Sequence, residues 1–92
     1  MDIQTVVGLV KDRLGIRSAV RDSYLTAIVN GVIEELTSEK GIVLGESNAN
    51  HLIFVVDYVT WRYQSRDSEG AIPRHLQFRL HNLIFSAGGQ GT

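Results

Sequence analysis

The sequence predicts an all-α domain, a small bundle of about four helices. Apolar residues recur at intervals of three and four along much of the 92-residue chain, which is the spacing of one helix face. Glycines and the single proline divide the chain into four segments, and the third of these is longer than an ordinary strand. The length suits one domain with one core, residues 1–92.

The first segment predicts a short amphipathic helix from Ile3 to Leu14. Asp2 is a typical N-cap residue, and Gly15 is a typical stop at the other end. One face carries the apolar residues Ile3, Val6, Val7, Val10 and Leu14.

The second segment predicts a helix that begins between Ser18 and Asp22, either of which can cap it, and closes at Lys40 and Gly41. Its apolar stripe consists of Leu25, Ile28, Val29, Val32, Ile33 and Leu36. Its outward face is acidic and carries Glu34, Glu35 and Glu39.

The third segment, residues 51–67, has some features typical of a strand and others typical of a helix. Its β-branched and aromatic residues favour a strand. Its length without glycine or proline, and the absence of strict alternation, favour a helix. As a helix it has only a narrow polar strip, with Asp57, Arg62 and Gln64, so we expect a central helix that is contacted on more than one side.

The fourth segment begins at Pro73, a favourable first helical residue. Its apolar residues are Leu76, Leu80, Leu83 and Ile84. Residues 86–92, SAGGQGT, are expected to form a flexible glycine-rich tail. In the loop of residues 41–50, the apolar start is expected to tuck under the bundle.

Composition excludes several classes of protein. Nine Lys and Arg against ten Asp and Glu give a net charge of -1, which argues against a free-standing duplex-binding domain. A hydrophobic content of 43% excludes a disordered tail, and no stretch is apolar enough to span a bilayer. Asp2 argues against a signal peptide. With no cysteine, a reduced, soluble setting such as a bacterial cytoplasm fits best.

Catalytic and metal-binding patterns are sparse, so we expect no enzyme, no cofactor and no metal. The chain lacks a cysteine nucleophile, GxSxG, GxxxxGK[ST] and HExxH. His75 and His81 lie about 240° apart on a helix, so they cannot hold one metal from one face, and His51 lies on another segment.

Asp57 has two interpretations. It is either a catalytic charge or, as we favour, a carboxylate that accepts a hydrogen bond from a neighbouring arginine such as Arg62 or Arg66.

Trp61, with Tyr58 and Tyr63, also has two interpretations. The three aromatic residues form either a platform for stacking bases or, as we favour, part of the core or of a subunit interface.

The net charge differs between the two parts of the chain. The part before Asn48 sums to -2 and the rest to +1. A head-to-tail contact between identical subunits would use this polarity.

The order of these features resembles that of a known family. A helix ending in LG, a helix reading DSYLTAIVNGVIEELT, a polar loop, VDYVTWRYQSRD and IPRHLQFRLHNLIF follow one another. Over residues 6–85 this arrangement is similar to the small head-to-tail connector, or adaptor, proteins of tailed bacteriophages and prophages. The most specific part is the apolar third segment with its final run of Trp61, Arg62, Tyr63 and Arg66, followed by the helix that starts at Pro73.

The resemblance implies a helical, non-enzymatic virion protein at the head-tail interface, assembled in the bacterial cytoplasm. Copies would form a ring, usually of twelve, under the capsid portal. The ring would extend the DNA channel, without sequence-specific DNA binding or membrane contact, and offer a platform for a stopper or tail-completion protein. Residues 73–92 would engage the portal.

Two sets of residues follow from the pattern and the resemblance together. The candidate portal or ring interface comprises Arg62, Arg66, Arg74, Arg79, Glu34, Glu35, Glu39 and Phe85. The candidate core comprises Leu25, Ile28, Val32, Leu36, Val56, Val59, Trp61, Tyr63, Leu76, Leu80 and Leu83. The alternatives are a helical DNA-binding or regulatory module, for which neither the second nor the fourth helix has a basic reading face, and a generic protein-interaction bundle.

Overall fold

The computed structural model describes residues 1–45, 48–66 and 71–89, the last four of these by their backbone alone. These residues form α1 (Ile3–Leu14), α2 (Asp22–Glu34), the short π-helix η1 (Glu35–Glu39), α3 (Ala49–Gln64) and α4 (Arg74–Gly89). No strand occurs within the described ranges. The predicted all-α class is therefore confirmed.

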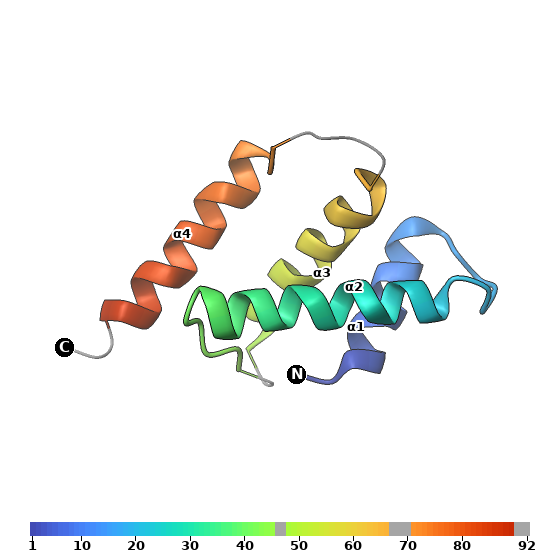
Figure 1. The fold of residues 1–92 in the computed structure, drawn as a ribbon, viewed down its shortest axis with the longest axis horizontal. Coiled ribbons are helices and arrows are strands. Elements are labelled where there is room, and N and C mark those ends of the chain that lie inside the picture. Colours follow the sequence, from blue (N-terminus) through green and yellow to red (C-terminus); the bar gives the residue numbers. More distant parts are fainter. Residues whose placement is uncertain (46–47, 67–70, 90–92) are drawn as a thin grey trace.

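Helix α3 is the centre of the arrangement. Helices α1, α2 and α3 all pack on one another, whereas α4 lies against α3 alone among the described helices (Figure 1). The molecule measures 46 × 29 × 19 Å along its principal axes. The result is a three-helix body with a fourth helix attached to its central member.

Helix α1 has the limits that its sequence predicts, because both caps are present. The Asp2 carboxylate accepts hydrogen bonds from the Thr5 N–H at 3.2 Å and from the Thr5 hydroxyl at 2.6 Å. The hydroxyl bond is the main cause of the lowered pKa of Asp2. At the other end Gly15 has a φ of 75°, and its N–H donates to the carbonyl of Asp12. This left-handed conformation suits glycine.

Helix α2 lacks the predicted side-chain cap. It follows Arg21, which makes no side-chain capping bond, and neither Ser18 nor Asp22 takes that role. Asp22 lies inside the helix, where its carboxylate accepts a hydrogen bond from Lys11 Nζ of α1 at 2.7 Å. The acid that was expected to cap α2 thus joins α2 to α1.

The far end of α2 widens into η1 before the chain turns. The predicted stop is confirmed: Gly41 has a φ of 68°, and the Ile42 N–H donates to the carbonyl of Leu36 at 2.9 Å. Ile42 is buried, as expected for the apolar start of the loop, but Val43 is largely exposed.

The third segment is a helix despite its strand-favouring residues. Asn48 caps α3 by accepting hydrogen bonds from the N–H groups of Asn50 and His51. Buried side chains point from α3 in several directions: Phe54, Val55, Val56, Tyr58, Val59, Thr60 and Tyr63. The expected central helix is confirmed, because packing on several sides outweighs the modest intrinsic preference of β-branched residues for strands.

The core contains most of the residues predicted for it. Of the candidate core, the structure buries Leu25, Val32, Leu36, Val56, Val59, Tyr63, Leu76 and Leu80. The other three are only partly buried and pack against this core: Ile28, Trp61 and Leu83. Buried residues outside the predicted set include Val6, Val10, Val29 and Phe54.

Helix α4 starts directly after Pro73, whose carbonyl accepts hydrogen bonds from the N–H groups of Leu76 and Gln77 at 3.0 and 2.9 Å. Leu76 and Leu80 are its buried side chains among those described. The backbone of α4 continues to Gly89. Residues 86–89, which were expected to belong to a flexible tail, thus form the last turn of α4. Residues 90–92 lie outside the described part, so their flexibility stays a prediction.

A matched pair of valine substitutions tests this core. Val29 is 0% exposed and Val43 is 81% exposed. We expect Val29→Ala to lower the free energy of unfolding by about 2 kcal/mol, through lost burial and a residual cavity. Val43→Ala should change it by less than about 0.5 kcal/mol. Urea denaturation measures both, and equal losses would contradict the assigned core.

Candidate functional site

A pocket with a volume of about 440 Å³ lies between α1, α3 and α4. Charged, polar and aromatic side chains line it, among them Arg13, Asp57, Trp61, Gln64, His75 and Arg79. Asp57 and Gln64 of the polar strip of α3 line this pocket, whereas Arg62 does not.

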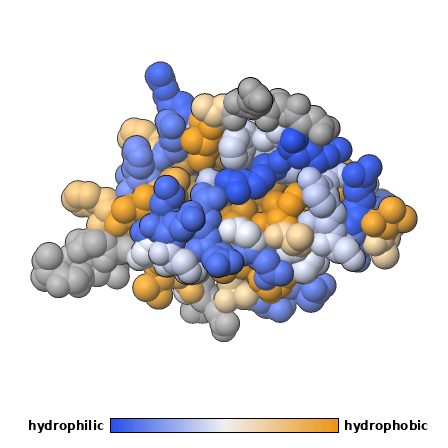
Figure 2. All heavy atoms as spheres, in the orientation of Figure 1, coloured by the Kyte–Doolittle hydropathy of each residue, from blue (hydrophilic) through white to orange (hydrophobic). Residues whose placement is uncertain are grey.

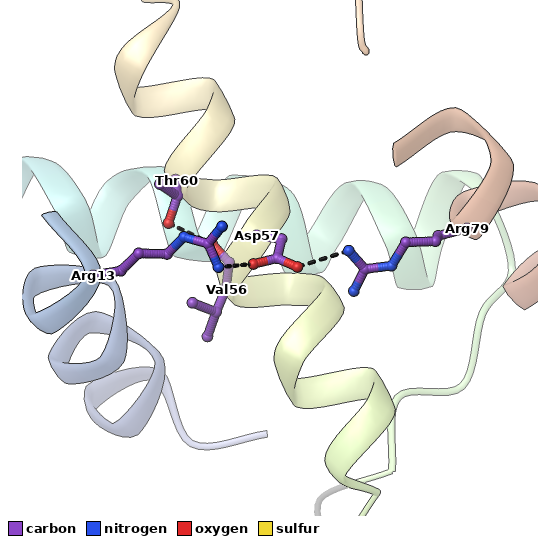
Figure 3. A network of polar contacts seen from close by, with 5 residues as sticks. All are labelled: Arg13, Val56, Asp57, Thr60 and Arg79. Carbon is purple, nitrogen blue, oxygen red and sulfur yellow. Dashed lines mark hydrogen bonds and ion pairs between the residues drawn. The ribbon is translucent and has the colours of Figure 1, made fainter. Parts of the chain in front are cut away.

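Asp57 lies at the centre of this group and is only 14% exposed by its side chain. Its Oδ1 accepts a hydrogen bond from Arg13 of α1, and its Oδ2 accepts one from Nη1 of Arg79 of α4 at 2.7 Å (Figure 3). One carboxylate therefore links the first and last helices to the third, through two charge-assisted hydrogen bonds.

The arginine bond expected for Asp57 is present, but the expected partners were wrong. Arg62 follows Asp57 by five residues and Arg66 by nine. On a helix these positions lie about 140° and 180° away from Asp57, so their side chains face other neighbours. Arginines on adjacent helices take their place.

Arg62 belongs to a second polar cluster, which joins α3 to η1. Its Nη2 donates to Oε1 of Glu35 at 3.1 Å and to the Tyr58 hydroxyl at 3.2 Å. The Tyr58 hydroxyl donates to Oε2 of Glu35 at 2.7 Å. Burial, aided by this bond to a carboxylate, raises the pKa of Tyr58 to about 12.

The structure divides the candidate interface residues into two groups. Those engaged in ion pairs within the chain are Glu35, Arg62 and Arg79. Those exposed to solvent are Glu34, Glu39, Arg66, Arg74 and Phe85. Arg66 donates to the carbonyl of Tyr63 at 2.6 Å and lies over the ring of Tyr63, 4.3 Å from its centroid.

The aromatic residues of α3 pack into the fold. Tyr58 and Tyr63 are buried, and Trp61 is half-buried. The rings of Tyr58 and Trp61 meet edge to face, with an interplanar angle of 89°. An exposed platform for stacking bases needs accessible ring faces, so this geometry favours the packing interpretation.

Helix α4 exposes two phenylalanines on one face, with the exposed polar residues His81 and Asn82 between them. Phe78 is 68% exposed and Phe85 is 81% exposed. Seven residues separate them, so they lie on one face, whereas Leu76 and Leu80 turn toward the body. Figure 2 shows hydrophobic side chains reaching the surface over α4. The sequence analysis included Phe85 but missed Phe78, although their seven-residue spacing was a usable signal.

The histidines do not converge. Nδ1 of His51 accepts a hydrogen bond from the Gly45 N–H at 3.0 Å, while His75 and His81 are exposed on α4. Across the described residues, no group of three or more histidine, aspartate and glutamate side chains is placed to hold a metal ion. None of the described helices is both long and apolar enough to cross a membrane.

Comparison with known proteins yields no relative: no family model matches the chain, and no curated protein or solved structure is significantly similar to it.

The Asp57 link can be tested by removing its charge. We expect Asp57→Asn to lower the free energy of unfolding by about 1–2 kcal/mol, because Arg13 and Arg79 lose their anionic partner. Asp12→Asn, at an exposed position of α1, should change it by less than about 0.5 kcal/mol. Urea denaturation measures both, and equal losses in the two variants would contradict the assigned ion pairs of Asp57.

Tyr58 predicts a loss of stability in alkali. The folded state holds the pKa of Tyr58 at about 12, above the ordinary tyrosine value of 10.0. The stabilising contribution is therefore complete below pH 10 and is lost as the pH rises toward 12, on the order of 2 kcal/mol in all. Tyr58→Phe should unfold with a weaker dependence on pH over this window. Equal pH profiles for the two proteins, measured by denaturant titration, would contradict the assigned environment of Tyr58.

Proposed function

We propose that this chain is a structural, non-enzymatic subunit of a bacteriophage or prophage head-to-tail connector. In this role, copies form a ring under the capsid portal, extend the DNA channel and offer a docking platform for a stopper or tail-completion protein. The order of the sequence motifs suggests this assignment, and the all-α fold agrees with it.

The observation that carries the proposal is the arrangement of α4. Leu76 and Leu80 attach this helix to α3, while Phe78 and Phe85 stand uncovered on another face. A helix that is held from one side and exposes two phenylalanines on another suits docking against a larger partner, here the portal. Burying a phenylalanine side chain contributes about 1.5–3 kcal/mol, and a ring multiplies such contacts by presenting many copies at once.

Exposed charges supply a complementary contact between neighbouring copies. Glu34 and Glu39 are exposed at the end of α2 and in η1, whereas Arg66 and Arg74 are exposed near the junction of α3 and α4. An acidic surface on one subunit and a basic surface on the next give a head-to-tail contact that closes into a ring. The ion pairs of Glu35, Arg62 and Arg79 lie within the subunit. The contact between copies is therefore made by the four exposed residues.

The small net charge of -1 fits a channel through which DNA slides. A strongly basic lining would neutralise many phosphates and hold the DNA by counterion release. The proposed ring surrounds the DNA without sequence-specific binding, at the head-tail interface of the virion.

The proposal predicts association with a portal. We expect the purified protein, mixed with the portal ring encoded in the same genome, to form a complex whose mass in solution exceeds that of the portal alone. Phe85→Asp should weaken this association at least about tenfold, because the charged group resists burial in an apolar contact. Light scattering coupled to size-exclusion chromatography measures the mass.

Val43→Asp is the matched control, because Val43 is as exposed as Phe85 but lies on the loop after η1. It should leave portal association unchanged, and both variants should keep the unfolding midpoint of the parent. Protein that stays monomeric and never associates with the portal would overturn the proposal. Submicromolar binding to duplex DNA at low salt would favour a DNA-binding module in its place.

A further inference from the structure

We propose that the pocket between α1, α3 and α4 binds a monocarboxylate attached to an apolar or aromatic group. This site is separate from the exposed face of α4 that carries the proposed function. Its features are two guanidinium groups that flank Asp57 and an apolar part of the wall.

The two arginines of the pocket have hydrogen-bond donors to spare. Arg13 and Arg79 each use one Nη1 on Asp57, and a guanidinium group has five N–H donors in a rigid fork. Asp57 therefore fixes both groups (Figure 3), and each has N–H donors beyond the one bonded to Asp57, on a side chain that lines the pocket. Arg79 is held additionally by its position over the Phe54 ring, 5.3 Å from the centroid.

The lining of the pocket carries an excess of positive charge. Two guanidinium groups and one carboxylate line the pocket, so its charged side chains sum to about +1. Pro73 and His75 also line it, which places the start of α4, the positive end of its helix dipole, at the same wall. A single carboxylate matches this excess. A doubly charged phosphate would bring a second negative charge close to Asp57.

The pocket has room for a small molecule and an apolar part in its wall. Trp61 and Leu76 form an apolar part of the lining, and Trp61 is half-buried. The volume of about 440 Å³ lies within the range of small-molecule sites. An anion with an apolar body places its carboxylate on the arginines and its body against Trp61. The source is either a free organic acid or the carboxyl terminus of another protein chain.

Trp61 also provides the measurement, because it is the single tryptophan of the chain. We expect phenylacetate to produce a saturable change in Trp61 fluorescence at millimolar or lower concentration. Phenylacetamide, which has the same shape without the charge, should bind at least about tenfold more weakly. The dipeptide Gly-Phe and its amide form a second pair that tests the protein-terminus source: tighter binding of the dipeptide assigns the site to a chain terminus, and tighter binding of phenylacetate to a free acid.

Two arginine variants locate the site. Arg13→Gln should weaken phenylacetate binding at least about tenfold, whereas Arg74→Gln, an exposed residue of α4 outside the pocket lining, should stay within about twofold of the parent. Arg13→Lys keeps the charge and should retain intermediate affinity. Thermal unfolding of each variant establishes that it is folded.

The outcomes separate cleanly. Absence of a saturable signal with either acid, or equal binding of acid and amide by the parent protein, overturns the proposal without reference to any variant. Equal loss in Arg13→Gln and Arg74→Gln, both folded, also overturns it. Portal association in the earlier experiment is independent of all these results.

Discussion

The attachment of α4 depends on one carboxylate on a helix that is otherwise almost wholly apolar. Asp57 is a largely buried acid, and an acid in that position costs free energy unless donors surround it. Arg13 and Arg79 supply the donors from opposite sides. The same two bonds set where α1 and α4 lie relative to α3, because both guanidinium groups must reach one side chain. Leu76 and Leu80 then complete the contact of α4 with α3.

Tertiary packing determines the helical conformation of α3 more than the intrinsic preferences of its residues do. Its β-branched and aromatic residues favour a strand, yet they surround a helix that neighbours cover on several sides. Residue type alone gave the wrong indication for this segment, and length without glycine or proline gave the right one. The limits of α1 could be predicted closely, because Asp2 and Gly15 act locally, within the turns that they cap. Local signals are the ones that a single sequence contains most directly.

The ion pairs and the pocket that escaped prediction all depend on contacts between different helices. Arg13 is 44 residues from Asp57, and Glu35 is 27 residues from Arg62; no spacing rule within one segment connects such pairs. Asp22 was expected as a cap, but Lys11 of another helix is within reach of its carboxylate. The pocket likewise requires three helices and could not be located before they were placed. The exposed face of α4 is different, since Phe78 and Phe85 are related by simple helical spacing.

Because α4 lies at the side of a three-helix body, the residues of the body and the outward face of α4 are under different evolutionary constraints. Val6, Leu25, Val29 and Val59 are buried in the body, so changes there are limited by folding. The outward face of α4 contributes little to the core, and surface substitutions of this kind have small effects on stability. Sequence drift on that face is thus restrained mainly by whatever it contacts. Homologous chains would be expected to keep the body while varying α4, so that one scaffold adapts to different partners.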